Sequence, residues 1–181
     1  MLQFVAIAAG AAVAGVLGVA ARRPDTFRMH RSAVIDAPPE RIHPLISDFR
    51  KWADWSPYEK LDPEMKKTYS GAATGRGAVY AWEGNKKAGA GRMEMTETSP
   101  QRIAINLEFT RPFKASNVTT FTLQPHGAGT EVTWAMEGPN PFINKVMGVL
   151  INLDRLVGKD FEAGLANLKT IAERHPSAPA Y

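Results

Sequence analysis

Residues 103–110 read IAINLEFT, and apolar and polar side chains alternate through the whole stretch. A strand places alternate side chains on opposite faces, so this segment has one apolar face and one polar face. The residues of the apolar face are Ile103, Ile105, Leu107 and Phe109. One apolar face per strand is typical of an antiparallel sheet that is packed on one side only.

The neighbouring segments show the same alternation. EVTWAME (residues 131–137) and GAVYAWE (residues 77–83) each place a tryptophan on the apolar face. Short connections rich in Gly and Pro separate these segments, which is typical of antiparallel hairpins. We therefore expect about seven strands, over Arg28–Asp36, Met65–Gly71, Gly77–Glu83, Gly89–Glu97, Ile103–Thr110, Asn117–Leu123 and Glu131–Glu137.

The C-terminal part of the chain changes to a helical period. From residue 143 to residue 171, apolar residues recur at steps of three and four. One helix of about 30 residues would be about 45 Å long, which is more than a small domain can cover. We therefore expect a break near Gly148 or Gly158, and a long helix from about Leu156 to Glu173 across the apolar face of the sheet.

A second helix is expected between the first strand and the rest of the sheet. It begins in APPE (residues 37–40), because prolines and an acidic residue favour a first helical turn. It ends near KWADWSPYEK (residues 51–60), where Trp52 and Trp55 are three residues apart and share one helix face. We expect this face, with Tyr58 beside it, either to close the open end of a hollow or to fill the core beneath the loop.

Several short motifs occur in a fixed order along this pattern. WADWSPY (residues 52–58) has the form W-x-x-W-S-P-aromatic, and TEVTW (residues 130–134) has the form T-x-V-T-W. The others are Ile35–Glu40, the set Gly77, Tyr80, Trp82 and Gly84, and the G-x-G of Gly89 and Gly91.

From about Arg28 to Glu173 the chain therefore resembles the START-like or SRPBCC superfamily, and within it the polyketide cyclase/dehydrase-type branch. The resemblance implies an α+β helix-grip fold, in which a curved antiparallel sheet wraps around a long C-terminal helix. Members of the superfamily include lipid and sterol carriers, coenzyme-Q-binding proteins, aromatase/cyclases and hydrolase-like proteins. The fold alone therefore does not imply one function.

The sequence contains no recognisable catalytic or metal-binding set. The four histidines lack the spacing of metal ligands, and no acid/base pair is visible. By alternation Arg92, Glu94 and Glu108 face away from the hollow, which leaves Tyr80 as a weak catalytic candidate. We therefore expect no metal and no cofactor, and we favour a binding role over an enzymatic one.

The expected ligand contacts are aromatic residues and methionines, since ligand pockets are mostly apolar and these side chains are large and adaptable. The candidates are Trp52, Trp55, Tyr58, Tyr80, Trp82, Met93, Met95, Phe109, Phe113, Trp134, Met136 and Phe161. The expected partner is a hydrophobic small molecule or lipid. The net charge of +4 comes without an aromatic–basic nucleic-acid motif, so nucleic acid is not expected. No pattern indicates an oligomeric state.

The N-terminal segment is expected to be separate from the domain. Residues 1–21 carry no charged side chain and are long enough to span a membrane, and arginines follow them. We expect residues 1–22 to be a single-pass anchor with the domain in the cytoplasm, or else a signal segment that is cleaved on export. Residues 23–27 would be a linker, 28–174 the domain and 175–181 a disordered tail.

These observations support three functional hypotheses. The first is that a membrane-anchored domain binds an apolar small molecule, such as a lipid, an isoprenoid or a polyketide-like compound. The second is an enzyme of the polyketide cyclase/dehydrase type. The third is a regulatory or chaperone module whose interior is filled by side chains and which binds a protein partner.

Overall fold

The computed structural model describes residues 2–150 and 153–174. One layer is an antiparallel sheet in the order β1-β7-β6-β5-β4-β3-β2. Its strands are β1 (Thr26–Ile35), β2 (Lys66–Gly71), β3 (Ala78–Glu83), β4 (Ala90–Ser99), β5 (Arg102–Arg111), β6 (Ala115–His126) and β7 (Gly129–Pro139). The predicted strands and their antiparallel pairing are thus confirmed. The predicted disordered tail lies outside the described residues.

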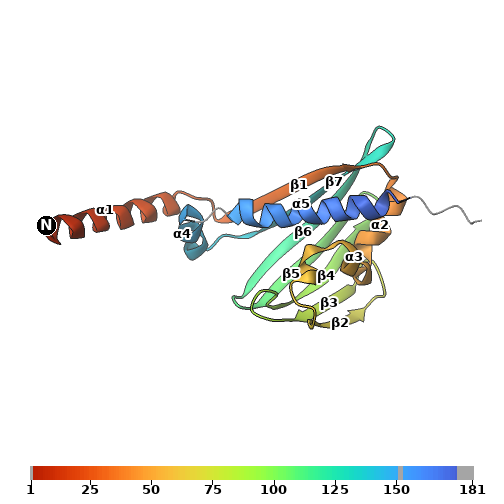
Figure 1. Cartoon of the computed structure of the whole chain (residues 1–181), viewed down its shortest axis with the longest axis horizontal. Coiled ribbons are helices and arrows are strands. Elements are labelled where there is room, and N and C mark those ends of the chain that lie inside the picture. Colours follow the sequence, from red (N-terminus) through yellow and green to blue (C-terminus); the bar gives the residue numbers. More distant parts are fainter. Residues whose placement is uncertain (1, 151–152, 175–181) are drawn as a thin grey trace, which may run out of the picture.

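The long helix α5 (Leu153–Ala172) covers the inner face of the sheet and runs beside β1, as Figure 1 shows. The shorter α4 (Phe142–Leu150) precedes it, so the predicted break exists and follows Leu150. The end of α4 lies two residues after Gly148, close to one of the two predicted positions, whereas Gly158 lies within α5. Both glycines face an arginine. A Cβ atom added at Gly148 would lie 2.5 Å from Nη1 of Arg23.

The other helices lie at the two ends of the molecule. The helix α2 (Pro39–Ser47) begins at its prolines with Glu40 in the first turn, as the sequence predicts. Three short segments follow it, namely the 3-10 helix η1 (Phe49–Lys51), α3 (Trp52–Trp55) and the 3-10 helix η2 (Pro57–Lys60). Of these, α3 and η2 pack against α5, and η1 packs against β3.

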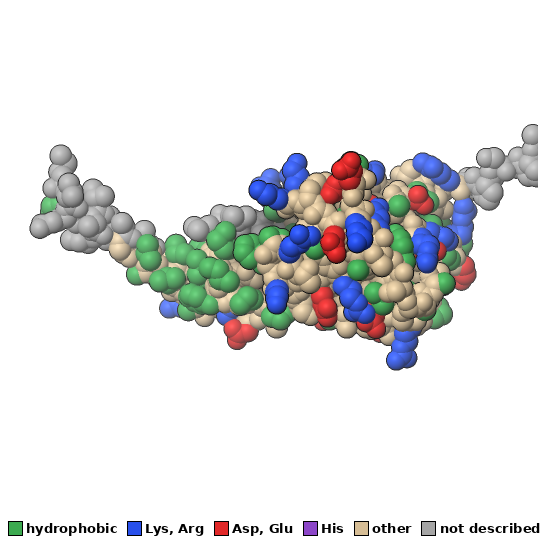
Figure 2. Space-filling view, turned by 90° about the horizontal axis from the view of Figure 1, so that it is seen from below, with side chains coloured by type: hydrophobic (Ala, Val, Ile, Leu, Met, Phe, Trp, Pro, Cys, Tyr) green, Lys and Arg blue, Asp and Glu red, His purple; other side chains and the backbone are tan. Residues whose placement is uncertain are grey.

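At the opposite end, α1 (Leu2–Ala21) extends away from the sheet and contacts α4 (Figure 1). Within residues 2–150 and 153–174, no helix combines the length and the apolar character that crossing a membrane requires. In Figure 2, hydrophobic side chains gather where α1 and α4 adjoin the domain, and the exposed ones on α4 include Phe142, Ile143 and Met147.

The helix α5 is fixed to the sheet by apolar packing and by ion pairs at its edge. Phe161, Leu165 and Leu168 are fully buried against the sheet. Burial of each such side chain contributes about 1.5–3 kcal/mol to stability. At the edge, Arg31 of β1 pairs with Glu162 at 2.8 Å and with Asp154 at 3.1 Å, so α5 is tied to the first strand along its outer side.

A glycine allows α5 to approach the sheet closely. Gly164 faces the six-membered ring of Trp134, and an added Cβ atom would lie 2.7 Å from Cζ3 of Trp134 and 3.2 Å from Cδ of Pro57. Both neighbours are rigid rings, so neither can move aside easily. The small residue at position 164 therefore sets the distance between α5, the sheet and the segment after α3.

We expect Gly164→Ala to lower the free energy of unfolding by about 1–3 kcal/mol, because the added methyl group overpacks this contact. Urea unfolding followed by circular dichroism measures the change. Gly18→Ala in α1 is the matched control, since nothing lies within 4 Å of its added Cβ atom. A Gly164→Ala protein with wild-type stability would show that the contact relaxes without cost.

Candidate functional site

A cavity of about 730 Å³ lies between the inner face of the sheet and α5. Its floor comes from strands β3 to β7, and its roof comes from the N-terminal half of α5 and from the segment that follows α3. The exposed lining residues Leu61, Lys87 and Leu156 mark its mouth. The remaining lining residues are buried or half-buried, so the cavity is a pocket that opens at one end.

Most of the predicted ligand contacts line this cavity. The aromatic residues and methionines alternate along the strands, so their side chains project together from the inner face of the sheet. The predicted residues found in the wall are Trp52, Tyr58, Tyr80, Trp82, Met93, Phe109, Trp134, Met136 and Phe161. The sheet pattern thus brings them together, and their contact with a ligand remains a prediction.

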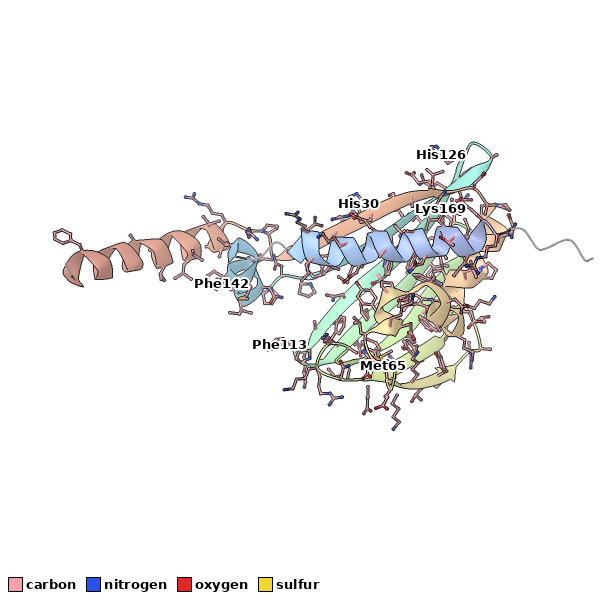
Figure 3. The ribbon with its side chains drawn as sticks, in the orientation of Figure 1. His30, Met65, Phe113, His126, Phe142 and Lys169 are labelled. Carbon is pink, nitrogen blue, oxygen red and sulfur yellow. The ribbon has the colours of Figure 1, made fainter. Side chains whose placement is uncertain are left out.

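Three predicted residues lie elsewhere. Trp55 and Met95 are both 0% exposed and belong to the packed core, outside the cavity wall. Phe113 is 82% exposed in the turn between β5 and β6, and Figure 3 shows it at the end of that hairpin. The strand alternation ends before the turn, so Phe113 does not continue the apolar face of Phe109.

The tryptophans of the W-x-x-W-S-P motif are held by the backbone of α2. Nε1 of Trp52 donates to the carbonyl of Ile46, and Nε1 of Trp55 donates to the carbonyl of Leu45, both at 2.9 Å. Ser56 has an extended ψ of 126°, as expected for a residue before proline, so the chain turns away after α3. The Trp pair therefore lies at the closed inner end of the cavity. Trp52 forms part of the cavity wall, and Trp55 belongs to the packed core.

Trp134 is the centre of the aromatic cluster at this inner end. Its ring stacks on Phe161 of α5 with centroids 4.2 Å apart and an interplanar angle of 5°. It also meets Phe121 at 5.0 Å, Trp55 at 5.6 Å and Tyr58 at 6.3 Å. Offset and edge contacts of this kind add about 0.5–1.5 kcal/mol per pair beyond area burial.

Several residues of the cavity wall, both polar and apolar, were not predicted. The residues that the sequence prediction missed are Ser56, Glu59, Leu61, Met65, Lys87, Ala88, Leu107, Thr119, Leu156, Val157 and Asp160. Leu107 was identifiable, because it shares the apolar face of Phe109. Glu59 and Asp160 had no such signal, since one lies in a short 3-10 helix and the other depends on how α5 is rotated.

Glu59 forms a buried polar group with two strand residues. The Tyr80 hydroxyl donates to Oε1 of Glu59 at 2.7 Å, and Nζ of Lys67 pairs with Oε2. The Glu59 side chain is only 6% exposed. Burial and the bonded carboxylate raise the pKa of Tyr80 well above its ordinary value, so the hydroxyl remains protonated. Both carboxylate oxygens are thus engaged, and the group fastens η2 to β2 and β3.

Tyr58 and Asp160 form a second polar region beside the aromatic cluster. Burial, followed by the negative charge of Asp160, raises the pKa of Tyr58. Burial also raises the pKa of Asp160. Both side chains are half-buried in the cavity wall. They add a hydroxyl and a carboxylate to a wall that consists mainly of apolar and aromatic side chains.

Outside the cavity, the polar candidates behave as the alternation predicts. Arg92 pairs with Glu94 at 2.7 Å, and both side chains are about two-fifths exposed.

Over the described residues, no group of three or more His, Cys, Asp or Glu side chains could hold a metal ion. Figure 3 shows His30 on β1 and His126 at the far end of the β6–β7 hairpin.

Comparison with known proteins agrees with this architecture. A family described as "Polyketide cyclase / dehydrase and lipid transport" matches residues 26–173. No curated protein matches the chain.

Solved structures share the fold at low sequence identity. The di-domain ARO/CYC protein BexL of the BE-7585A biosynthetic pathway is 15% identical with a TM-score of 0.61, over 88% of this chain and 54% of that one. Protein CV1439 from Chromobacterium violaceum is 21% identical with a TM-score of 0.57, over 84% and 100%. The Aha1 protein from Colwellia psychrerythraea is 14% identical with a TM-score of 0.58, over 81% and 96%. At these identities the likeness concerns the fold alone.

The raised pKa of Tyr80 predicts a loss of stability in alkaline solution. An unfolded tyrosine ionises near pH ~10, whereas the folded protein keeps Tyr80 protonated. The folded state therefore binds more protons above that pH, and the stability from Tyr80 is full below pH ~10 and falls as the pH rises towards the folded pKa. We expect Tyr80→Phe to make the alkaline decline shallower by up to about 1.4 kcal/mol per pH unit.

Urea unfolding at a series of pH values from 8 to 11.5 measures this slope. The comparison uses slopes, because loss of the hydrogen bond to Glu59 lowers stability at every pH. Identical slopes for the wild type and Tyr80→Phe would contradict the prediction.

Proposed function

Because the chain belongs to the polyketide cyclase/dehydrase and lipid transport family, we propose that the cavity beneath α5 binds an apolar small molecule, such as a lipid, an isoprenoid or a polyketide-like compound. The cavity of about 730 Å³ is the observation that carries the proposal. Ligand pockets commonly measure about 300–1,000 Å³ and are lined mainly by apolar and aromatic side chains. The wall described above has that size and that composition.

The lining of the cavity supports a ligand with a large apolar body. The inner end is closed by Trp52 and Trp134, and the mouth is bordered by Leu156, which is 60% exposed at the start of α5. Between them, Met93 and Met136 offer flexible side chains that adapt to different ligand shapes. A ligand can therefore enter lengthwise and bury its apolar part against the aromatic cluster.

A cyclase- or dehydrase-type enzyme is the alternative, and one observation favours it. Glu59 and Tyr80 line the cavity, share a 2.7 Å hydrogen bond and provide a carboxylate and a hydroxyl where a substrate would lie. A general acid or base must lie within hydrogen-bond reach of the reacting group. Turnover of a polyketide-type substrate that is lost in Glu59→Gln, with binding retained, would establish this alternative.

The third hypothesis is a regulatory or chaperone module that binds a protein partner. This hypothesis predicts an interior that is filled by side chains, and the presence of the cavity argues against it. Small-molecule binding therefore accounts for more of the structure.

We also propose that residues 1–22 attach the domain to a membrane, with the domain on the cytoplasmic side. Support comes from the sequence, since residues 1–21 lack charge and Arg22 and Arg23 follow them directly. The exposed apolar side chains of α4 beside α1, visible in Figure 2, suit contact with the apolar part of a lipid layer. Removal of residues 1–22 as a signal segment is the alternative.

Expression of the full chain with a C-terminal tag tests this localisation. We expect the tagged protein to sediment with membranes, to resist extraction at pH 11 and to retain the mass of the full chain. A shortened protein recovered outside the cell would favour the cleaved signal segment.

Filling the cavity should abolish ligand binding. Leu107 is half-buried in the wall, and Leu107→Trp places a large ring in the cavity. We expect the affinity for the uncharged fluorescent lipid probe N-phenyl-1-naphthylamine to fall by at least about tenfold, which corresponds to about 1.4 kcal/mol. Native mass spectrometry of the purified wild type provides a second test, since it would detect a ligand retained from the cell.

The matched control is Val118→Trp. Val118 is partly exposed on β6 and is absent from the cavity wall, so the same substitution there adds a ring outside the cavity. Thermal unfolding of both variants separates loss of the site from loss of the fold. Equal probe affinity in the wild type and a folded Leu107→Trp would refute binding in this cavity.

A further inference from the structure

The polar side chains of the cavity wall differ in whether they already have partners. Glu59 is fully engaged by the Tyr80 hydroxyl and the Lys67 ammonium group. The hydroxyl of Ser56 and Nε1 of Trp134 have no hydrogen-bond partner among the described residues, but both atoms are sealed inside the wall. None of these groups is both reachable from the cavity and free to bind a ligand.

Tyr58 and Asp160 differ from these groups. In the described part of the chain, neither the Tyr58 hydroxyl nor the Asp160 carboxylate has a hydrogen-bond or ion-pair partner, and the negative charge of Asp160 contributes, after burial, to the raised pKa of Tyr58. Both side chains are half-buried and line the cavity. They come from different elements, η2 and α5, which contact each other in the fold.

The surroundings of this pair make an unpartnered polar group costly. Trp134 meets the Tyr58 ring edge-on at 6.3 Å, and Phe161 and Val157 adjoin Asp160 on α5. A polar group that loses water in such surroundings costs free energy unless a hydrogen bond replaces the lost solvation. A ligand that brings a hydrogen-bond donor to Asp160 would supply this bond.

We propose that the ligand of this cavity carries a hydroxyl group, which donates to the Asp160 carboxylate and accepts from the Tyr58 hydroxyl while the apolar body of the ligand fills the remainder. A hydroxyl is a donor and an acceptor on one atom, and it therefore satisfies both protein groups at once. The inference rests on the proposed function, because it names the chemistry of a ligand in the same cavity.

Other polar groups that line the cavity agree with a neutral head group. Lys87 at the mouth would repel a cationic ligand. Thr119 on the floor adds only one further hydroxyl. A ligand with a carbonyl and no donor would leave Asp160 without a partner, so the pair distinguishes alcohols from ketones.

Four tricyclic probes of nearly equal shape test the proposal: fluorene, 9-fluorenol, 9-fluorenone and 9-aminofluorene. Their affinities are measured by quenching of tryptophan fluorescence and by isothermal titration calorimetry. We expect the wild type to bind 9-fluorenol about tenfold more tightly than fluorene, since a hydrogen bond to a charged group has about that net effect. We expect 9-fluorenone to bind no better than fluorene.

Two substitutions test whether Tyr58 and Asp160 cause the preference for 9-fluorenol. Asp160→Asn, whose amide can donate, should move the preference from 9-fluorenol towards 9-fluorenone. Tyr58→Phe should reduce the preference for 9-fluorenol to about threefold or less, through loss of one neutral hydrogen bond. Asp54→Asn is the matched control, because Asp54 is exposed on α3 outside the cavity wall, and it should keep the wild-type preference.

The outcomes separate this inference from the proposed function. If fluorene, 9-fluorenol and 9-fluorenone bind the wild type equally well, the cavity binds apolar molecules and the hydroxyl inference is wrong. Tighter binding of 9-aminofluorene than of 9-fluorenol would also overturn it, in favour of a cationic head group. If none of the four probes binds, the proposed function and the inference fail together.

Discussion

The stacking of Trp134 on Phe161 is the contact on which the rest of the molecule depends. One ring comes from β7, next to the edge strand β1, and the other from α5, so the contact fixes the helix over the inner face at a defined distance. Gly164, one turn further along the helix, allows this approach because it has no side chain to hold the two apart. The cavity lies on one side of the stack, between the N-terminal half of the helix and strands β3 to β7.

The fold was largely predictable because each element has its own periodicity. The two-residue period identifies the strands and their inner faces, and the three-to-four-residue period identifies α5. The predicted break near Gly148 agrees with the end of α4 at Leu150, but the sequence could not show that Gly158 lies inside α5. Gly148 and Gly158 admit the side chains of Arg23 and Arg31, which are contacts between segments far apart in the chain.

The site was predictable only in its apolar part. Strand alternation specifies which side of the sheet Trp82 and Met93 occupy, and burial of that side follows from it. Strand alternation does not specify whether an inward-facing residue lines the cavity or packs in the core. Met95, two residues beyond Met93, is therefore found in the packed core. Asp160 could not be placed, because its position in the wall depends on the rotation of α5 about its axis, and apolar periodicity determines that rotation only coarsely.

The two halves of the helix α5 have different roles. Its C-terminal half provides Leu165 and Leu168, which are fully buried, whereas its N-terminal half provides Leu156 and Asp160, which border the cavity. Substitutions at Leu156 or Asp160 can therefore alter the cavity with little effect on folding, while substitutions at Leu165 or Leu168 mainly affect stability. The cavity can therefore change in shape and polarity while the architecture stays constant, because different residues of the same helix line the cavity and pack the core.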